Sequence, residues 1–281
     1  MKTAFSMLAL MPPVLILIMV AAGPIGGNPL DVPLAITRAS FLEARGGFDQ
    51  AAILYERLVD HVGPRPDMEA LAMEAHRNAG LASFTSRDFR TAMVHFAAAD
   101  RGAPHMFTQI VQAVCLQKLD TPDAALQLLK TTAAQFPRRA DPLLAIANLL
   151  AITGEFERAE GYYREAAVVD PGNPLVYINH GDALRWLNRK EEARRLYEKA
   201  LEVNQRNPEA HLRLAEMALA GGMTPAEVQR HLAEVRRHRP DHPGLSRLTA
   251  MVNGVAAPPP ATTRGLVPDQ RVLFTIQAPE W

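Results

Sequence analysis

Small residues recur along this chain at a nearly constant spacing of 34 positions. The first series is Ala39, Gly80, Ala113, Ala147, Gly181 and Ala215, with steps of 41, 33, 34, 34 and 34 residues. A second series keeps the same register and consists of Ala51, Ala92, Ala125, Ala159 and Ala193. A third, of larger apolar residues, follows the second by four positions at Tyr55, Phe96, Leu129, Tyr163 and Tyr197, and Leu232 closes it. Three series that share one period indicate an internal repeat.

Within a repeat, the apolar positions follow the period of an α-helix. Ala159, Tyr163 and Ala166 lie at i, i+4 and i+7, which places them on one face of a helix. Gly154 interrupts the chain just before this stripe. Each repeat is therefore predicted to form two short amphipathic helices. Where the helices cross, a small residue lets the backbones approach and the aromatic residue fills the neighbouring gap.

Helix starts are marked by an oxygen-bearing side chain followed by proline. The pairs are Thr121-Pro122, Asp141-Pro142, Asn173-Pro174, Asn207-Pro208 and Thr224-Pro225. The side-chain oxygen can accept from the free N–H groups of the first turn, and proline fits there because its missing N–H would have no helical partner. Thr224 and Glu227 also have the spacing of a capping box.

This pattern resembles the tetratricopeptide repeat, whose 34-residue helix-turn-helix units carry Gly or Ala and an Ala-x-x-x-aromatic motif at these spacings. The resemblance is strongest in residues 140–173, at Leu143, Ile146, Ala147, Leu150, Gly154, Phe156, Ala159, Tyr163, Ala166 and Pro171. Six repeats are expected, at about 32–65, 73–105, 106–139, 140–173, 174–207 and 208–242. The resemblance implies an all-α fold, a right-handed α-solenoid over residues 32–242.

The chain departs from the family pattern at the turns and at two junctions. Asp120 and Asn188 stand where glycine usually turns between the paired helices, and both residue types tolerate the left-handed conformation. About seven extra residues near 66–72 separate the first two repeats and are expected to lengthen the first helix of the second repeat. The last repeat carries one extra residue beside Gly221.

The two ends of the chain differ from the repeats. Residues 3–30 carry no charge, and a nine-residue apolar run, 14–22, follows Lys2. Residues 1–22 are therefore predicted to be a cleaved signal peptide or a membrane anchor, either of which exports the chain, or else a disordered leader; residues 23–31 are predicted to be a linker. Residues 243–254 are predicted to form a capping helix through a stripe of Leu245, Leu248, Met251 and Val252.

The proline-rich residues 255–281 are predicted to be a disordered tail. Within it, residues 272–276 have β-forming side chains. This segment could pair with a partner's sheet edge, fold back on the concave surface of the repeats, or be an apolar patch without a role.

Composition narrows the function. Equal numbers of basic and acidic residues, 30 of each, argue against binding nucleic acid. The single cysteine, Cys115, excludes an intramolecular disulfide and lies among apolar residues that predict its burial. His238 and His242 have a metal-like spacing but straddle Pro240, which favours a solvated turn. Because no phosphate-binding loop, metalloprotease helix or nucleophile motif is present, we expect no enzymatic activity, cofactor or metal.

The resemblance also implies a concave groove formed by the first helix of each repeat. Carried onto this sequence, the groove positions are apolar in the early repeats and polar in the later ones. They are Arg77, Asn78, Leu81, Phe84, Phe107, Ile110, Val111, Val114, Leu144, Asn148, Ile178, Asn179, Asp182, Arg185, Trp186 and Arg213. A bound segment would bury apolar side chains early in the groove, and the later amide groups would bind its backbone.

Some members of the family hold a partner's C-terminal carboxylate with two lysines, two asparagines and an arginine. Asn148, Asn179 and Arg213 match three of these positions, but Leu144 and Glu209 stand where the lysines are expected. Each such change in charge weakens a bound carboxylate by about 1–4 kcal/mol at close range, so this clamp is not expected to be the main binding mode. The alternatives are hydrogen bonds within the stack for the polar residues and packing between repeats for the apolar residues and Trp186.

These observations predict a non-enzymatic adaptor that binds a segment of another protein in the groove. Family analogy places it in the assembly or maturation of a cell-envelope complex, periplasmic or anchored in the inner membrane through residues 1–22 alone. The alternative function is a structural protein that assembles into homo-oligomers, which the segment 272–276 suggests.

Overall fold

The computed structural model describes residues 31–44, 47–62, 69–101, 104–221 and 224–253. The expected leader, most of the linker and the tail lie outside these residues. Within them the ordered elements are helices, and no strand is present, which confirms the all-α prediction. No helix in the described part is both long enough and apolar enough to cross a membrane.

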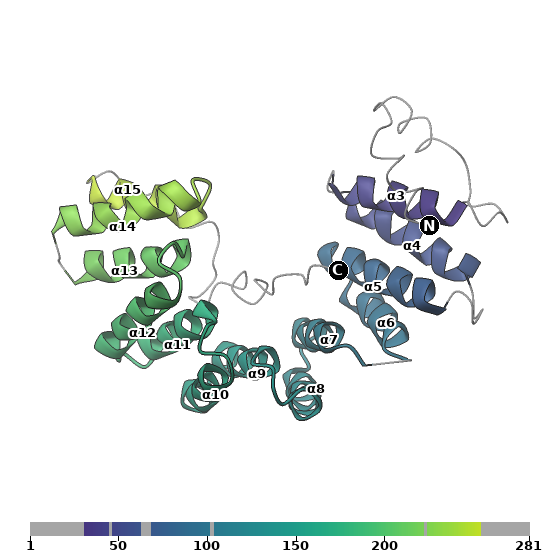
Figure 1. The fold of residues 1–281 in the computed structure, drawn as a ribbon, viewed down its shortest axis with the longest axis horizontal. Coiled ribbons are helices and arrows are strands. Elements are labelled where there is room, and N and C mark those ends of the chain that lie inside the picture. The colour runs from purple at the N-terminus through teal and green to yellow at the C-terminus, as the bar shows by residue number, and fades with distance from the viewer. Residues whose placement is uncertain (1–30, 45–46, 63–68, 102–103, 222–223, 254–281) are drawn as a thin grey trace. The chain divides into compact units, whose positions relative to one another are not determined.

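The chain divides into two compact units, with the boundary after Ala125. The helices of the N-terminal unit are α3 (Asp31–Ala44), α4 (Phe48–Val62), α5 (Glu69–Thr85), α6 (Phe89–Ala99) and α7 (Met106–Lys118). Each of these helices packs against the next one in the sequence (Figure 1). The extra residues near 66–72 lie at and just before the start of α5, which has 17 residues. The unit boundary falls within α8 (Pro122–Gln135).

The C-terminal unit continues the same succession of helices. They are α9 (Asp141–Ile152), α10 (Phe156–Val169), α11 (Pro174–Trp186), α12 (Lys190–Val203), α13 (Pro208–Ala220), α14 (Pro225–His238) and α15 (Pro243–Val252). Consecutive helices from α9 to α15 pack side by side, and α15 contacts both α13 and α14 (Figure 1). Helices that each pack on the next one form the α-solenoid fold in this unit.

The core of each unit is a series of clusters that consecutive helices share. Tyr55 and Leu58 lie in a cluster built from α3, α4 and α5. Tyr197 lies in a cluster of α11, α12 and α13, and Leu232 and Leu248 lie in one of α13, α14 and α15. Because no hairpin buries its apolar face alone, each depends on its neighbour for stability.

Gly80 in α5 and Gly181 in α11 explain the series of small residues. A Cβ added to Gly80 would lie 2.7 Å from the ring of Phe96, and one added to Gly181 would lie 2.6 Å from the ring of Tyr197. Both rings are fully buried. The small residue and the aromatic ring therefore share one space, which confirms the packing expected from the sequence.

The turns inside four hairpins use a residue with a positive φ. These residues are Arg87 (φ 68°), Asp120 (φ 61°), Gly154 (φ 86°) and Asn188 (φ 57°). Asp120 and Asn188 thus take the left-handed conformation that their positions indicated. Arg87 does so with a long side chain, at a cost of roughly 1–2 kcal/mol relative to glycine.

The predicted helix caps are present at Asn173, Asn207 and Thr224, and Thr224 forms the expected capping box. The prediction was wrong for Asp141, which lies in the first turn of α9 and makes no cap hydrogen bond. Its carboxylate accepts instead from Nε of Arg139, at 3.1 Å. Because α9 starts at Asp141, the residue in the capping position is Ala140, which has no side-chain oxygen.

Candidate functional site

In the N-terminal unit, the predicted groove residues lie on α5 and α7. They are Arg77, Asn78, Leu81 and Phe84 on α5, and Phe107, Ile110, Val111 and Val114 on α7. Ile110 is buried, and Phe107 packs against the cluster that contains Phe96. Phe84 meets Phe89 edge to face, with 5.6 Å between ring centroids. The apolar part of the predicted groove therefore packs hairpin against hairpin, while Phe107 and Val114 remain partly exposed.

Cys115 on α7 is completely buried in this cluster, as its apolar neighbours predicted. Burial raises the pKa of its thiol to about 12. Because the thiolate is the nucleophilic form, this cysteine stays neutral and unreactive near pH 7. Among the described residues, no group of three or more His, Cys, Asp or Glu side chains could hold a metal ion.

In the C-terminal unit, two buried asparagines join successive first helices. Nδ2 of Asn179 on α11 donates to Oδ1 of Asn148 on α9, at 3.0 Å. The hydroxyl of Tyr163 on α10 donates to the same oxygen, at 2.8 Å. Oδ1 of Asn179 has no hydrogen-bond partner among the described residues. A buried acceptor without a partner costs about 1–3 kcal/mol.

Asp182 on α11 and Arg213 on α13 form a largely buried ion pair. Nε of Arg213 lies 2.8 Å from Oδ1 of Asp182, and the hydroxyl of Tyr197 donates to the same oxygen at 2.6 Å. Burial alone would lower the pKa of Arg213, but the carboxylates of Asp182, Glu209 and Glu216 raise it well above its ordinary value. The guanidinium is therefore fixed in its charged form.

Glu209 extends this pair toward α15. Its Oε1 lies 2.8 Å from Arg213, and its Oε2 lies 2.9 Å from Nε2 of His242. Nδ1 of His242 accepts the N–H of Gly244 at 3.1 Å, so Nε2 carries the proton and donates to Glu209. Burial alone would raise the pKa of Glu209, but His242 and Arg213 hold it below its ordinary value. The prediction of a solvated turn was wrong for His242, which is buried and caps α15.

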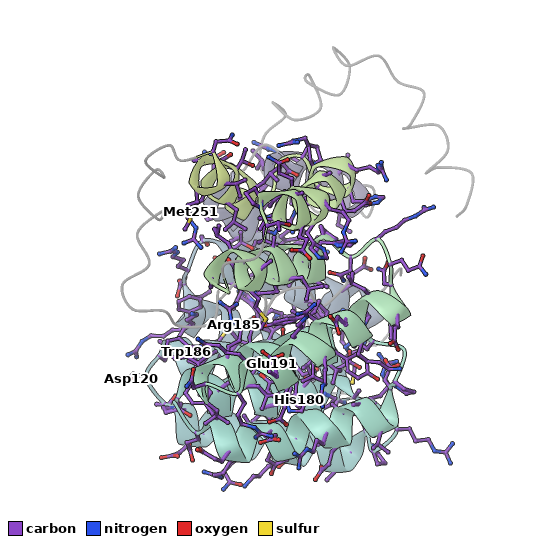
Figure 2. All side chains as sticks on the ribbon, turned by 90° about the vertical axis from the view of Figure 1, so that its left-hand side faces the viewer. Asp120, His180, Arg185, Trp186, Glu191 and Met251 are labelled. Atoms are coloured by element: carbon purple, nitrogen blue, oxygen red, sulfur yellow. The ribbon has the colours of Figure 1, made fainter. Side chains whose placement is uncertain are left out.

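Glu216 on α13 completes what we call the ion network. It lies 3.1 Å from Arg185, 3.5 Å from Arg213 and 3.4 Å from Arg247. The three carboxylates of the network are Asp182, Glu209 and Glu216, and its three guanidinium groups are Arg185, Arg213 and Arg247. Their formal charges cancel. The Arg185 and Arg247 side chains remain 36% and 41% exposed, so the network reaches the surface at these two residues. Arg185 is labelled in Figure 2.

Trp186 follows Arg185 at the end of α11 and packs on the preceding hairpin (Figure 2). Its ring stacks on Phe156 of α10, with 5.8 Å between centroids and 12° between planes. It is nevertheless 45% exposed. Leu144 on α9 is half-buried and packs against a cluster that includes Ala166 and Val176. The exposed ring of Trp186 is thus held in place by its stacking on Phe156.

A single spacing relates the contacts between first helices. The hydrogen-bonded pairs Asn148–Asn179, Asp182–Arg213, Arg185–Glu216 and Glu216–Arg247 each join residues 31 positions apart. In a 34-residue repeat, residue i+31 lies on the next first helix, about one turn before the equivalent position. Sequence reasoning missed Glu216 and Arg247. Complementary polar residues at i and i+31 would have revealed both.

Part of the sequence matches a known family. A profile of the tetratricopeptide repeat matches residues 116–174 and 178–243. The chain is a tetratricopeptide repeat protein. Such repeats form scaffolds for protein–protein interaction and are typically non-enzymatic adaptors, and the chain is a scaffold in this general sense.

Solved structures, among them those of tetratricopeptide repeat proteins, share the fold. A thermophilic protein of Thermus thermophilus is 20% identical, with a TM-score of 0.54 over 66% of this chain and 100% of its own. A protein of Parabacteroides merdae is 14% identical, with a TM-score of 0.58 over 79% of this chain and 85% of its own. The pilF protein of Pseudomonas aeruginosa is 14% identical, with a TM-score of 0.53 over 78% and 97%. No curated protein sequence matched the chain.

Proposed function

We propose that the chain is an adaptor that holds a segment of a partner protein against the first helices α9, α11 and α13. One observation carries this proposal: the asparagine pair and the ion network fix the polar side chains of these helices through their own contacts. Side chains that are already ordered lose little conformational entropy when a partner binds, so such a face favours binding.

The chemistry of this face also suggests how a segment is held. Arg185 and Arg247 offer exposed guanidinium groups, and Trp186 offers an aromatic ring. Tryptophan and arginine are the residue types that most often dominate the affinity of protein interfaces.

Site-specific photocrosslinking in the native cell tests the proposal. A photoreactive amino acid at position 186 is expected to give a discrete adduct with another protein. The matched control is position 168 on the second helix α10, where Val168 is 82% exposed. Equal adducts at the two positions, or none at position 186 in a correctly folded chain, would contradict the proposed face.

We further propose that the adaptor works outside the cytoplasm, in the assembly or maturation of a cell-envelope complex. The uncharged residues 3–30 with their apolar run after Lys2 support export. Sequencing the N-terminus of the mature protein distinguishes a cleaved signal from an anchor. Digestion of the repeats by protease added to intact cells with a permeabilised outer membrane is expected, and their full protection would contradict export.

The self-assembly alternative rests on residues 272–276, which lie outside the described residues, and it stays a prediction. Light scattering of the chain with and without residues 255–281 tests it. A mass that falls to that of a monomer when the tail is removed would support self-assembly, and equal monomer masses would exclude it.

A further inference from the structure

Two hairpins carry a pair of histidines at the same two positions of the repeat. His76 and His211 lie four residues before the small residue of the first series, and His95 and His231 lie one residue before the large apolar residue of the third series. The two Nδ1 atoms are 3.1 Å apart in the pair His76–His95 and 3.0 Å apart in the pair His211–His231. Ring centroids are 5.4 Å and 5.3 Å apart. The contact thus follows from the geometry of the repeat, since it forms independently in α5–α6 and in α13–α14.

The other hairpins place different side chains at these two positions. The equivalent pairs are Ala35 and Leu54, Gln109 and Leu128, Leu143 and Tyr162, and Tyr177 and Leu196. Each of these pairs contains at least one aliphatic side chain, and none contains an imidazole. Histidine is therefore not needed to close a hairpin of this fold, and its presence calls for another explanation.

The position of the protons can be worked out for each pair. One Nδ1 must donate and the other must accept. Nε2 of His211 lies 3.0 Å from the carbonyl oxygen of Gln205, which can only accept, so this Nε2 carries a proton. Neutral His211 then accepts at Nδ1, and His231 donates. In the other pair, Nε2 of His95 faces the carboxylate of Glu56 at 3.5 Å, so by the same reasoning His76 donates.

We propose that the two histidine pairs are acid-sensitive latches, each of which closes its hairpin through one shared proton and opens when both rings are protonated. A first added proton leaves the bond intact, because it binds the one bare outer nitrogen and one proton still bridges the two Nδ1 atoms, whichever ring then carries the charge. A second removes the acceptor, because every ring nitrogen then carries a proton. Two N–H groups and two positive charges would face each other across the Nδ1–Nδ1 contact, which repels the two helices.

The surroundings of the first pair oppose double protonation. The pKa of His76 is lowered to about 4, chiefly by burial and then by His95 and Arg101, with Asp60 opposing the shift. The charged groups around this pair are Glu56 and Asp60 on α4, and Asp88 and Arg101 beside the two ends of α6. The carboxylates of Glu56 and Asp60 favour binding of the first proton, but they do not offset the repulsion that opposes binding of the second.

The second pair has a similar environment. The pKa of His231 is lowered to about 4, chiefly by burial and then by His211, Arg230 and Arg194. The charged groups around it are Arg194 and Glu198 on α12, and Arg230 on α14. Because α13 also carries residues of the ion network, opening this latch would loosen that network. The latches do not depend on the proposed binding function.

The direction of the pH dependence follows from proton counting. An unfolded histidine binds its proton near pH 6.5, whereas His76 and His231 do so near pH 4 in the folded chain. Between these values the unfolded chain binds more protons, so stability falls as the pH falls from about 6.5 toward 4. Above that range the latches are intact.

The repeats themselves provide the substitutions that test the latches. The double variant His211→Tyr with His231→Leu gives the last hairpin the residues of its neighbour, and His76→Gln with His95→Leu does the same for the second hairpin. Urea unfolding is followed at pH 7.5 and pH 5.0. The full chain is used because α5–α6 and α13–α14 lie in different units. His238→Gln, which removes a histidine outside both pairs, is the matched control.

We expect the wild-type unfolding equilibrium constant to rise by about tenfold per pair between the two pH values, after allowing for partial exposure of the rings. Each double variant should lack the rise that comes from its own histidine pair, and His238→Gln should show the rises from both pairs. A rise that is the same in all the chains would overturn the proposal.

A measurement on the wild-type chain covers the case in which a variant fails to fold. Ring ¹⁵N shifts of selectively labelled histidines at pH 7.5 should show the Nε2–H tautomer for His211 and the Nδ1–H tautomer for His231. On titration, each pair should take up two protons in separate steps, with the second step below pH 5. If both rings of each pair titrate together near pH 6.5, the proposal is wrong.

Discussion

The first helices of the repeats pack in the same order in both units, but the side-chain contacts that join them to their neighbours differ. In the N-terminal unit, Ile110 and Phe107 of α7 pack through apolar contacts. In the C-terminal unit, α11, α13 and α15 are joined by the ion network. Apolar packing weakens gradually as atoms are removed, whereas a buried ion pair that loses one partner leaves an uncompensated charge. The C-terminal unit is therefore more specific in its contacts and more vulnerable to a change of charge.

Arg213→Ala tests this difference and should have the largest effect. It removes the positive charge between Asp182 and Glu209 and leaves both carboxylates largely buried. We expect the free energy of unfolding, measured in urea, to fall by about 3–5 kcal/mol. Arg206→Ala, at an exposed position, should change it by less than about 0.5 kcal/mol. Equal losses in the two variants would show that the network contributes nothing.

Gly80→Ala and Gly181→Ala test the feature that the two units share. Each added methyl group would press on a buried aromatic ring, so we expect losses of about 1–3 kcal/mol in both units. Gly161→Ala is the control, because a Cβ there meets nothing within 4 Å. It should stabilise α10 by about 0.5–1 kcal/mol. If all three variants melt at the wild-type temperature, the small residues have no packing role.

His180 should make the C-terminal unit more sensitive to acid than the N-terminal unit. It is buried against the ring of Tyr163, with its centroid 5.5 Å away. Burial lowers its pKa to about 4, although Glu160 at 3.9 Å opposes this shift. The unfolded chain thus binds the proton at a higher pH than the folded chain, and stability falls as the pH falls below about 6.5.

The variant His180→Phe retains a stacked ring and removes the titrating group. Between pH 7.5 and pH 5.0, its unfolding equilibrium constant should rise about tenfold less than that of the wild type. This effect is separate from the histidine pairs, which His180→Phe leaves unchanged. An identical rise in both chains would mean that His180 is protonated without cost in the folded state.

Local sequence signals predicted the helical repeat but not every side-chain contact. The three residue series predicted an all-α repeat, and the contact between Gly181 and Tyr197 confirms the reason for two of them. The cap prediction failed at Asp141 because the start of α9 includes that residue. The solvated turn predicted at His242 failed because its partner, Glu209, is 33 residues away.

The sequence alone determined the helical repeat, because a period of 34 and a helical stripe can be read from the order of the residues without knowing what their side chains contact. The groove residues could also be named from it, but not what they contact. Whether Asp182 or Arg213 faces a partner or another helix depends on side chains 31 residues apart, which come together only when neighbouring hairpins pack. The tertiary structure therefore decided which charges are neutralised inside the stack and which, as at Arg185 and Arg247, reach the surface. It also decided that two pairs of histidines meet, since an imidazole on each of two helices gives no sign in sequence of a shared proton.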